Sequence, residues 1–328
     1  MLIILLNGDK FATVMSLKVA ELTKIFGTVA AVDGVSFEIS VPSVVGFLGP
    51  NGAGKTTTMR VITGFLAPSH GSVKIDDEEV NMDNFRLRSK IGYLPESNPL
   101  YADLEVHEYL KFAGQLAGLG PKRTDERLDY VVDRCGLEDV LYEPISHLSK
   151  GYKQRAGLAQ AIIHDPDILI LDEPTSGLDP NQVIEIRKLI SELAQQKFVI
   201  LSTHILSEVQ ALCNRVLIIN KGKLVLDATS EELQRDGLGG LTLLIKTPRS
   251  REEVEKVISD AIPIKRISST AESGLVSIQL SSEDSHEIRE KIFDACVTNG
   301  MKLLDIRSSG SDLEKVFREL TVGENETR

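Results

Sequence analysis

The apolar positions along the chain follow two spacings. Apolar and polar residues alternate over 17–22 and 35–39, which predicts two half-exposed antiparallel strands. Unbroken apolar runs at 44–48, 168–171 and 199–201 predict strands buried on both faces. Buried strands alternating with helical spacing predict a largely parallel sheet with a mixed edge. Further strands are expected at 72–75, 91–94, 216–220 and 223–226 (a hairpin around Lys221–Gly222), and helices at 56–63, 124–164 (with breaks near Gly136 and Pro144) and 181–195.

The sequence after residue 229 follows a different plan. A short polar helix is expected at 230–236, and the glycine-rich stretch 237–240 indicates a linker. Beyond it, the order strand, helix, strand, strand, helix, strand is the split βαβ or ferredoxin-like pattern. These elements are expected at 241–246, 250–261, 264–268, 275–280, 285–299 and 302–306, followed by an amphipathic helix at 312–320.

The patterns predict an extension at 1–15, an α/β domain at 16–236 with a helical subdomain at about 97–164, and a small α+β domain at 237–328. The start, MLIILLNGDK, lacks a basic region and a small-residue cleavage site, so it is a poor signal peptide. Patterned sequence begins at Ser16, which favours translation from Met15 over a genuine extension. No apolar run approaches the ~20 residues that span a bilayer.

Composition and charge narrow the class of protein. The 328 residues are 42% hydrophobic and 26% charged, which is ordinary for a globular protein with one large and one small domain. The net charge of −11 is spread over both parts of the chain without a basic stripe, which argues against a nucleic-acid partner. Three widely spaced cysteines without a C-x-x-C pair favour free thiols over a disulfide or metal site.

The stretch GPNGAGKTT at residues 49–57 follows a buried strand and opens a helix. Gly49-x-x-x-x-Gly54-Lys55-Thr56 fits the P-loop pattern, in which glycines let backbone N–H groups converge on phosphate oxygens. The helix adds its positive N-terminal end. Lys55 is expected to reach the β- and γ-phosphates, and Thr56 to ligate Mg²⁺. A nucleotide triphosphate with Mg²⁺ is therefore the expected ligand.

A second chemical signal is the apolar strand 168–171, which ends in Asp172 and Glu173. Downstream of a P-loop, the first carboxylate is expected to hold Mg²⁺, and the second lies where a general base polarises the attacking water. The sequence thus predicts hydrolysis of the nucleotide.

Four further stretches identify the class of NTPase. The residues 148–155 (LSKGYKQR), with Ser149 at an N-cap, resemble the signature sequence of ATP-binding-cassette (ABC) ATPases. Ser176-Gly177-Leu178-Asp179 looks like that family's D-loop and Ser202-Thr203-His204 like its switch histidine. Lys24-Ile25-Phe26-Gly27 is similar to its A-loop, whose ring stacks on adenine, although phenylalanine replaces the commoner tyrosine. The resemblance covers about residues 17–228.

Two departures from the family pattern narrow the resemblance. Lys150 and Tyr152 stand where glycine and glutamine are commoner, and Glu96 holds the usual position of the Q-loop glutamine. An ionised Glu96 can approach Mg²⁺ or its water but cannot donate a hydrogen bond. Both changes resemble ABC-2-type exporter ATPases. The stretches 92–101 (GYLPESNPLY) and 312–317 (DLEKVF) are similar to gliding-motility-type and other ABC-2-type subunits.

The resemblance implies a head-to-tail homodimer with two ATP molecules between the subunits, each capped by Ser149 and Gly151 of the other copy. It implies a separate transmembrane permease docking near Glu96–Tyr101, and a place on the cytoplasmic face of the inner (plasma) membrane. The implied catalytic residues are Lys55, Glu96, Glu173 and His204, and the implied metal ligands are Thr56, Glu96 and Asp172. The implied nucleotide-binding residues are Phe26, Gly49, Pro50, Asn51, Gly52, Ala53, Gly54, Lys55, Thr56, Thr57, Ser149, Gly151 and Asp179.

Two alternatives to an exporter subunit stay open. One is the ATPase of an uptake importer, which works with a solute-binding protein. The other is a soluble ABC ATPase acting on DNA or ribosomes, against which the acidic charge and the single P-loop argue. For the tail, an interaction or dimerisation module is favoured over a small-ligand sensor, since the sequence shows no convergent polar cluster there.

Overall fold

The computed structural model describes residues 15–233, 240–264, 266–272, 274–281 and 286–309, with Phe317, Leu320 and Thr321. The chain divides into two compact units, Met1–Asp227 and Ala228–Arg328. Residues 1–14 of the predicted extension, the linker up to residue 239 and most of the predicted helix at 312–320 lie outside the described residues.

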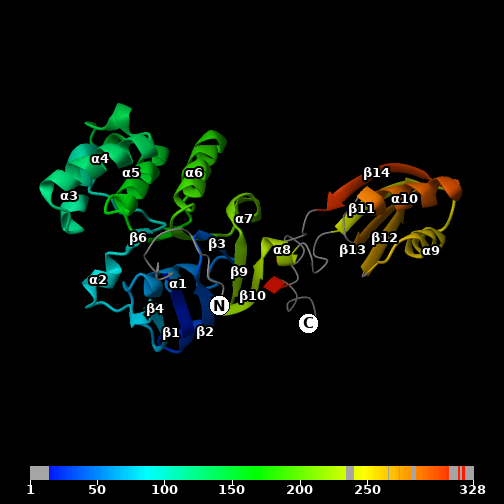
Figure 1. Cartoon of the computed structure of the whole chain (residues 1–328), viewed down its shortest axis with the longest axis horizontal. Helices are drawn as coiled ribbons and strands as arrows, with labels where there is room; N and C mark the ends of the chain where they lie inside the picture. The colour runs from blue at the N-terminus through cyan, green and yellow to red at the C-terminus, as the bar shows by residue number, and fades with distance from the viewer. Residues whose placement is uncertain are drawn as a thin grey trace, which may run out of the picture. The chain divides into compact units, whose positions relative to one another are not determined.

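A six-stranded sheet forms the centre of the first unit, with the order β10-β9-β3-β8-β7-β6 (Figure 1). Strand β3 runs parallel to β8 and β9, and β7 runs parallel to β6 and β8, which confirms the largely parallel sheet. Lys221 (φ 47°) and Gly222 (φ 80°) form the two-residue turn predicted between β9 and β10. The strands are β3 (Ser43–Leu48), β6 (Ile91–Leu94), β7 (Ile168–Asp172), β8 (Phe198–Thr203), β9 (Arg215–Asn220) and β10 (Lys223–Thr229).

A separate four-stranded sheet has the order β2-β1-β4-β5, and β1 pairs antiparallel with β2 and β4 as expected. The strands are β1 (Leu17–Phe26), β2 (Val29–Ile39), β4 (His70–Ile75) and β5 (Glu78–Glu79). Strands β1 and β2 are longer than the alternation predicted. The register of their pairing shifts between Val19 and Leu22 and again before Lys24 and Ile25, so a strict two-residue period is lost where the strands continue.

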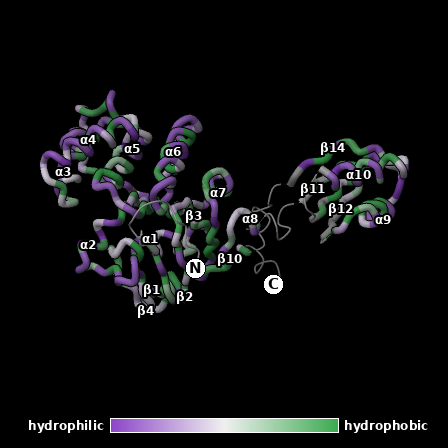
Figure 2. Tube along the Cα trace, viewed as in Figure 1, coloured by the Kyte–Doolittle hydropathy of each residue, from purple (hydrophilic) through white to green (hydrophobic). Residues whose placement is uncertain are grey.

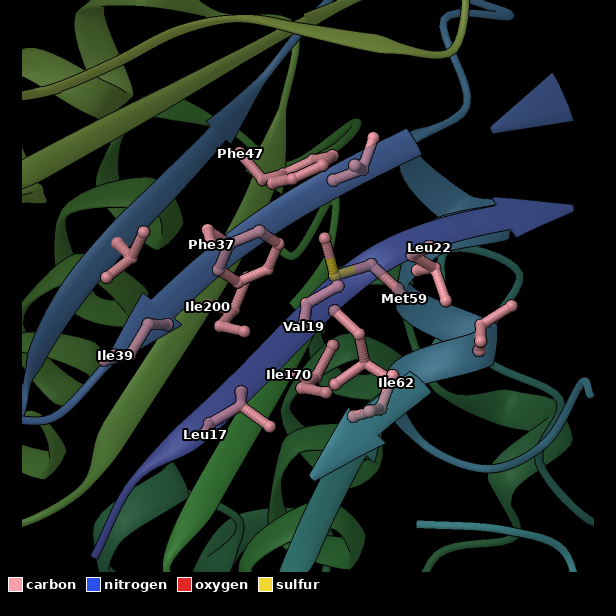
Figure 3. Packing of buried hydrophobic residues seen from close by; sticks show 14 of the residues in the cluster. Leu17, Val19, Leu22, Phe37, Ile39, Phe47, Met59, Ile62, Ile170 and Ile200 are labelled. Atoms are coloured by element: carbon pink, nitrogen blue, oxygen red, sulfur yellow. The ribbon is translucent and has the colours of Figure 1, made fainter. Parts of the chain in front are cut away.

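The main hydrophobic core lies between the two sheets. Leu17, Val19 and Leu22 of β1 point toward Ile170 and Ile200 of the six-stranded sheet (Figure 3). Met59 and Ile62 of helix α1 (Lys55–Ile62) complete this cluster. All of these side chains are at most 1% exposed, so burial of this apolar surface anchors the strands that carry the P-loop and the carboxylates.

Helices α3, α4 and α5 form the helical subdomain. Pro121 begins α4, three residues before the predicted start, because proline fits the first turn of a helix. Gly136 (φ 59°) ends α4, and Pro144 precedes a 3₁₀ turn, so both predicted breaks are confirmed. The helices of the first unit after α1 are α2 (Phe85–Arg88), α3 (Val106–Leu116), α4 (Pro121–Cys135), α5 (Lys150–Ile162), α6 (Pro180–Leu193) and α7 (Leu206–Leu212), with 3₁₀ turns at Glu138–Val140 and Ile145–His147.

The sequence analysis missed α2, α3 and α7. Helix α3 starts with a capping box in which Glu105, rather than Ser or Thr, accepts the N3 backbone N–H. Helices α4 and α6 alternate hydrophilic with hydrophobic residues, as the tube in Figure 2 shows, and this amphipathic pattern made them predictable. In the described ranges, no helix is both long and apolar enough to cross a membrane.

The second unit has the predicted strand and helix order. Its sheet is ordered β12-β13-β11-β14, with every neighbouring pair antiparallel, and α9 and α10 contribute Val254, Ile258 and Ile292 to its core. This is the ferredoxin-like arrangement. The elements are α8 (Ser230–Leu233), β11 (Gly240–Lys246), α9 (Arg251–Ala261), β12 (Arg266–Glu272), β13 (Leu275–Ser281), α10 (His286–Thr298) and β14 (Lys302–Ser309).

All three cysteines are buried and none forms a disulfide, as expected. Burial raises the pKa of the Cys135 thiol to about 12, and burial aided by the charge of Glu208 raises the pKa of Cys213 to about 12. A raised thiol pKa disfavours the reactive thiolate. At a pKa of about 12, roughly one thiol in ten thousand is ionised at pH 8.

We expect mass spectrometry to show negligible iodoacetamide labelling of Cys135 and Cys213 at pH 8 in native protein and full labelling in guanidinium. Rapid native labelling would contradict this.

Candidate functional site

The loop of residues 49–54 connects the carboxyl end of β3 to α1. A Cβ atom on Gly49 would lie 2.5 Å from the carbonyl oxygen of Ile219, and one on Gly54 would lie 2.4 Å from that of Ala31. Gly54 also has a φ of 107°, which side chains disfavour. The glycines therefore allow a loop packed against neighbouring backbone while its N–H groups stay at the amino end of α1, where an anion binds.

Lys55 begins α1, and its side chain folds back over this loop. Its Nζ donates a hydrogen bond to the Gly49 carbonyl oxygen at 2.8 Å and lies 3.5 Å from Glu173 Oε1. The side chain is 7% exposed. Lys55 therefore links the predicted phosphate loop to the carboxylate at the end of β7. Thr56 and Thr57 follow in the first turn of α1 and are half-buried.

Asp172 ends β7 and is fully buried. Its Oδ1 accepts a hydrogen bond from the Ser202 hydroxyl on the neighbouring strand β8. Its Oδ2 is buried and has no hydrogen-bond partner among the described residues. Burying a carboxylate oxygen without a partner costs free energy, and a hard cation is the ligand that best offsets the cost. The site therefore fits Mg²⁺.

A cation at this position does not need a cage of protein ligands. The described residues contain no group of three or more His, Cys, Asp or Glu side chains that could hold a metal ion. Mg²⁺ is commonly held by one or two carboxylates together with phosphate oxygens and water. Asp172 and the hydroxyl of Thr56 would supply that set together with a bound triphosphate.

Glu173 occupies a strained backbone position next to Asp172. Its φ is 52°, in the left-handed region, and its N–H donates to the Ser202 carbonyl oxygen at 3.0 Å. Both of its carboxylate oxygens lie within hydrogen-bond distance of His204 Nδ1, at 2.9 and 3.0 Å. An ionised carboxylate only accepts, so Nδ1 donates. The structure thus brings together Lys55, Glu173 and His204, three of the four predicted catalytic residues.

The fourth, Glu96, is exposed just beyond the end of β6. The pKa of the neighbouring Tyr93 phenol is raised to about 12 by burial first, then by the charge of Asp172, with a smaller contribution from Glu96. Arg60 partly offsets the rise. Glu96 follows the last residue of β6 by two positions, and its role at the metal stays a prediction.

The remaining predicted residues lie on other elements. Phe26, at the end of β1, is 50% exposed with Lys24 Nζ 5.3 Å above its ring. Ser149 is the N-cap of α5, as predicted, and accepts the Tyr152 N–H at 3.3 Å. In the described part of the chain, no hydrogen bond or ion pair joins Phe26, Ser149 or Asp179 to the Lys55–Glu173–His204 cluster.

Two contacts, one in the D-loop stretch and one of the signature glycine, were not predicted from the sequence. Asp179 is the N-cap of α6, where its Oδ1 accepts the N–H groups of Asn181 and Gln182 at 3.0 Å each. The Asp-Pro start of α6 is a capping signal that could have indicated this. Gly151 is buried, and a Cβ there would lie 2.5 Å from the side-chain amide of Gln182. That contact joins distant segments and has no local signal.

The known proteins that this chain resembles are ATP-binding subunits of ABC transporters. A family model described as ABC transporter matches residues 32–176. The bacitracin transport ATP-binding protein BcrA of Bacillus licheniformis is 31% identical over 94% of this chain and 97% of its own. The Nod factor export ATP-binding protein I of Ralstonia nicotianae is 30% identical over 96% of both chains. A solved structure of the ATP-binding subunit of an ABC transporter aligns with a TM-score of 0.62 and 29% identity, covering 67% of this chain and 92% of that chain.

The packing at Gly54 yields a test of the loop. Gly54→Ala would place its Cβ against Ala31 and force one N–H away from the phosphates. Loss of one hydrogen bond to a charged group costs about 1.5–3 kcal/mol, so we expect roughly 10- to 150-fold weaker ATP binding by titration calorimetry. The control is Gly120→Ala, where a Cβ meets nothing within 4 Å. Equal affinity in both variants would contradict the assignment of the loop.

Proposed function

The chain belongs to the ABC transporter family as an ATP-binding and ATP-hydrolysing subunit, and we propose that it drives an ABC-2-type membrane exporter. The observation that carries the catalytic part is Glu173, which contacts both Lys55 and His204. It directly follows Asp172, whose Oδ2 has no hydrogen-bond partner among the described residues. The export part is supported by full-length relatives named for Nod factor export and bacitracin transport, and by the ABC-2-like stretch 92–101. These relatives favour export over uptake or a soluble role.

We propose a task for each residue of the cluster. Lys55 moves from the Gly49 carbonyl to the β- and γ-phosphates when ATP is bound, which leaves Glu173 free to accept a proton from the attacking water. His204 orients the Glu173 carboxylate through Nδ1 and contacts the γ-phosphate. Asp172 and Thr56 would hold Mg²⁺, which supplies charge neutralisation of the phosphate oxygens. Phe26 offers an exposed ring face to adenine.

We further propose that two copies enclose two nucleotides. Ser149 Oγ already accepts the Tyr152 N–H, so its hydroxyl proton is left to donate to a phosphate on the partner copy. Gly151 lies at the second position of the 13-residue helix α5, where the backbone N–H lacks an intrahelical acceptor. Together these donors form an anion-binding end suited to the γ-phosphate. Lys150, adjacent to both, adds a positive charge.

The predicted permease contact also has a matching surface. A groove of about 480 Å³ lies beside the stretch 96–101 and is lined by exposed aromatic and aliphatic side chains of α3 and its neighbours. Phe65 is 66% exposed, Tyr101 59% and Leu116 69%. Large apolar side chains gathered around one groove favour a partner that buries them. We propose that a cytoplasmic helix of a separate permease occupies it at the membrane surface.

The groove is tied to the signature helix. Asn98 has a φ of 41° and donates from Nδ2 to the Lys153 carbonyl oxygen at 2.6 Å, in the first turn of α5. Gly157 leaves room for it, since a Cβ there would lie 2.2 Å from Asn98 Oδ1. A shift of the loop that carries Asn98 therefore acts directly on the helix that carries Ser149, which gives docking a route to the nucleotide.

For the second unit we propose an interaction role rather than a ligand sensor. Helix α10 exposes Phe293 (56%) and Val297 (60%), one turn apart, so the helix presents an apolar strip. Exposed apolar side chains that adjoin one another favour contact with another protein surface.

The base and the dimer can be tested with one substitution. Glu173→Gln keeps the shape of the side chain but removes its ability to accept a proton, so we expect ATP turnover to fall at least ~1000-fold while ATP binding persists. With Mg-ATP this variant should elute and scatter X-rays as a dimer. The matched control is Glu287→Gln, which changes an exposed carboxylate of the second unit. Normal turnover in Glu173→Gln would refute the base, and a monomer with bound ATP would refute the sandwich.

Docking is tested by placing a charge in the groove. Leu116→Lys puts an ammonium at the apolar lining, so we expect the fraction of chain retained on membranes to fall severalfold, since burying an unpaired charge is costly. Basal ATPase activity should not change, because Leu116 is exposed and distant in sequence from the catalytic motifs. Ile184→Lys is the control, as Ile184 is 63% exposed on α6 outside the groove. Equal membrane retention in both variants would rule out this groove.

A further inference from the structure

Glu208 is a buried acidic side chain to which the proposed chemistry assigns no role. It lies in the first turn of α7 and is 2% exposed. Its Oε2 accepts a hydrogen bond from Thr203 Oγ1 at 2.7 Å, and its Oε1 accepts one from Thr175 Oγ1. No ion pair of Glu208 occurs among the described residues. Its charge is therefore stabilised in the protein interior by two hydroxyl donors.

The two threonines belong to the two segments that carry the catalytic pair. Thr203 directly precedes His204, and its hydroxyl also accepts the Ile205 N–H at 3.0 Å. Thr175 follows Glu173 by two residues, in a turn closed by the Ser176 N–H and the Glu173 carbonyl oxygen at 3.1 Å. One carboxylate thus bridges the segment of the base and the segment of the histidine, from behind the site.

The bridge holds the two catalytic segments at a fixed distance from each other. A buried carboxylate is costly unless its oxygens are paired, and these hydroxyls supply the pairing while they fix the distance between the two segments. The left-handed backbone at Glu173 persists only where surrounding contacts hold it. The 2.9–3.0 Å contacts between Glu173 and His204 Nδ1 require both segments to stay in register.

We propose that Glu208 is a positioning residue for ATP hydrolysis, which sets the geometry of Glu173 and His204 through Thr175 and Thr203. The inference rests on the proposed roles of Glu173 and His204. The side-chain hydrogen bonds of Glu208 run to Thr175 and Thr203. It holds the two catalytic segments at a fixed separation, and the P-loop, which binds the nucleotide, does not depend on it.

The first test separates catalysis from binding. Glu208→Leu removes both hydrogen bonds, and because a displacement of about 1 Å in catalytic geometry costs up to ~100-fold, we expect kcat to fall by roughly 30- to 100-fold. The KM for ATP should stay within about threefold, since Lys55 and the loop are unchanged. Glu208→Gln should restore kcat to within about fivefold of the parent, because its carbonyl accepts from one threonine and its amide donates to the other.

Each of the two hydrogen bonds to Glu208 can be removed separately by a substitution that keeps the volume of the side chain. Thr175→Val and Thr203→Val each remove one hydroxyl, and each should lower kcat without raising KM. When either threonine variant is combined with Glu208→Leu, the loss of kcat should be smaller than the product of the two separate losses, because all three changes break the same bridge. The matched control is Thr124→Val. Thr124 lies in α4, is 1% exposed and donates a hydrogen bond from its hydroxyl to the Gly120 carbonyl oxygen, and this variant removes that bond. It should lower the thermal midpoint comparably and leave kcat unchanged.

The outcomes distinguish this inference from the proposed function. If Glu173→Gln is inactive while Glu208→Leu hydrolyses ATP at the parent rate, the positioning role is wrong and the proposed base stands. If Glu173→Gln retains turnover, the proposed base fails and the positioning role fails with it. A loss of kcat and ATP affinity together, shared by Thr124→Val, would show that Glu208 serves only stability. Recovery in Glu208→Gln with an unchanged KM supports the proposal.

Discussion

The pairing register of parallel strands is the constraint on which the site depends. Leu48 of β3 pairs with Thr203 of β8, and Asp172 of β7 pairs with Ser202 of β8. Parallel strands end at the same edge of a sheet, so the P-loop, the carboxylates and the switch histidine arrive side by side. A slip of one residue would turn the wrong side chains to each face and separate Ser202 from Asp172.

The core between the two sheets holds that register. Phe47 and Leu48 are fully buried at the point where β3 becomes the phosphate loop, and Ile170 and Leu171 are fully buried just before the carboxylates. Close-packed apolar side chains tolerate little displacement. The polar groups that the core leaves at the strand ends are therefore held stiffly enough for the unpaired Asp172 oxygen and the strained Glu173 backbone to persist.

Polar contacts also join the helical subdomain to the segments around it. Asn98 joins the groove loop to α5, and Arg134–Glu192 and Arg155–Glu185 join the helical subdomain to α6. Ion pairs with an exposed partner contribute little free energy each, so these two contacts can break and re-form at small cost. The tight register at the strand ends and these weak ion pairs are compatible with the proposed cycle, in which ATP closes a dimer and hydrolysis reopens it.

The sequence by itself determined the P-loop, the Asp172–Glu173 pair, the buried parallel strands and the order of elements in the second unit, because glycine spacing and hydrophobic period are local properties. It missed α3 and α7, whose starts lack a Ser, Thr, Asp or Asn cap. It also predicted β1 and β2 too short, because bulges broke the alternation. Only the tertiary structure decided that Ser202 pairs with Asp172, that Asn98 requires Gly157, and that Glu208 joins Thr175 to Thr203. Those contacts join residues that lie far apart in the sequence, so no local pattern predicts them. They form because folding brings the polar groups together away from water.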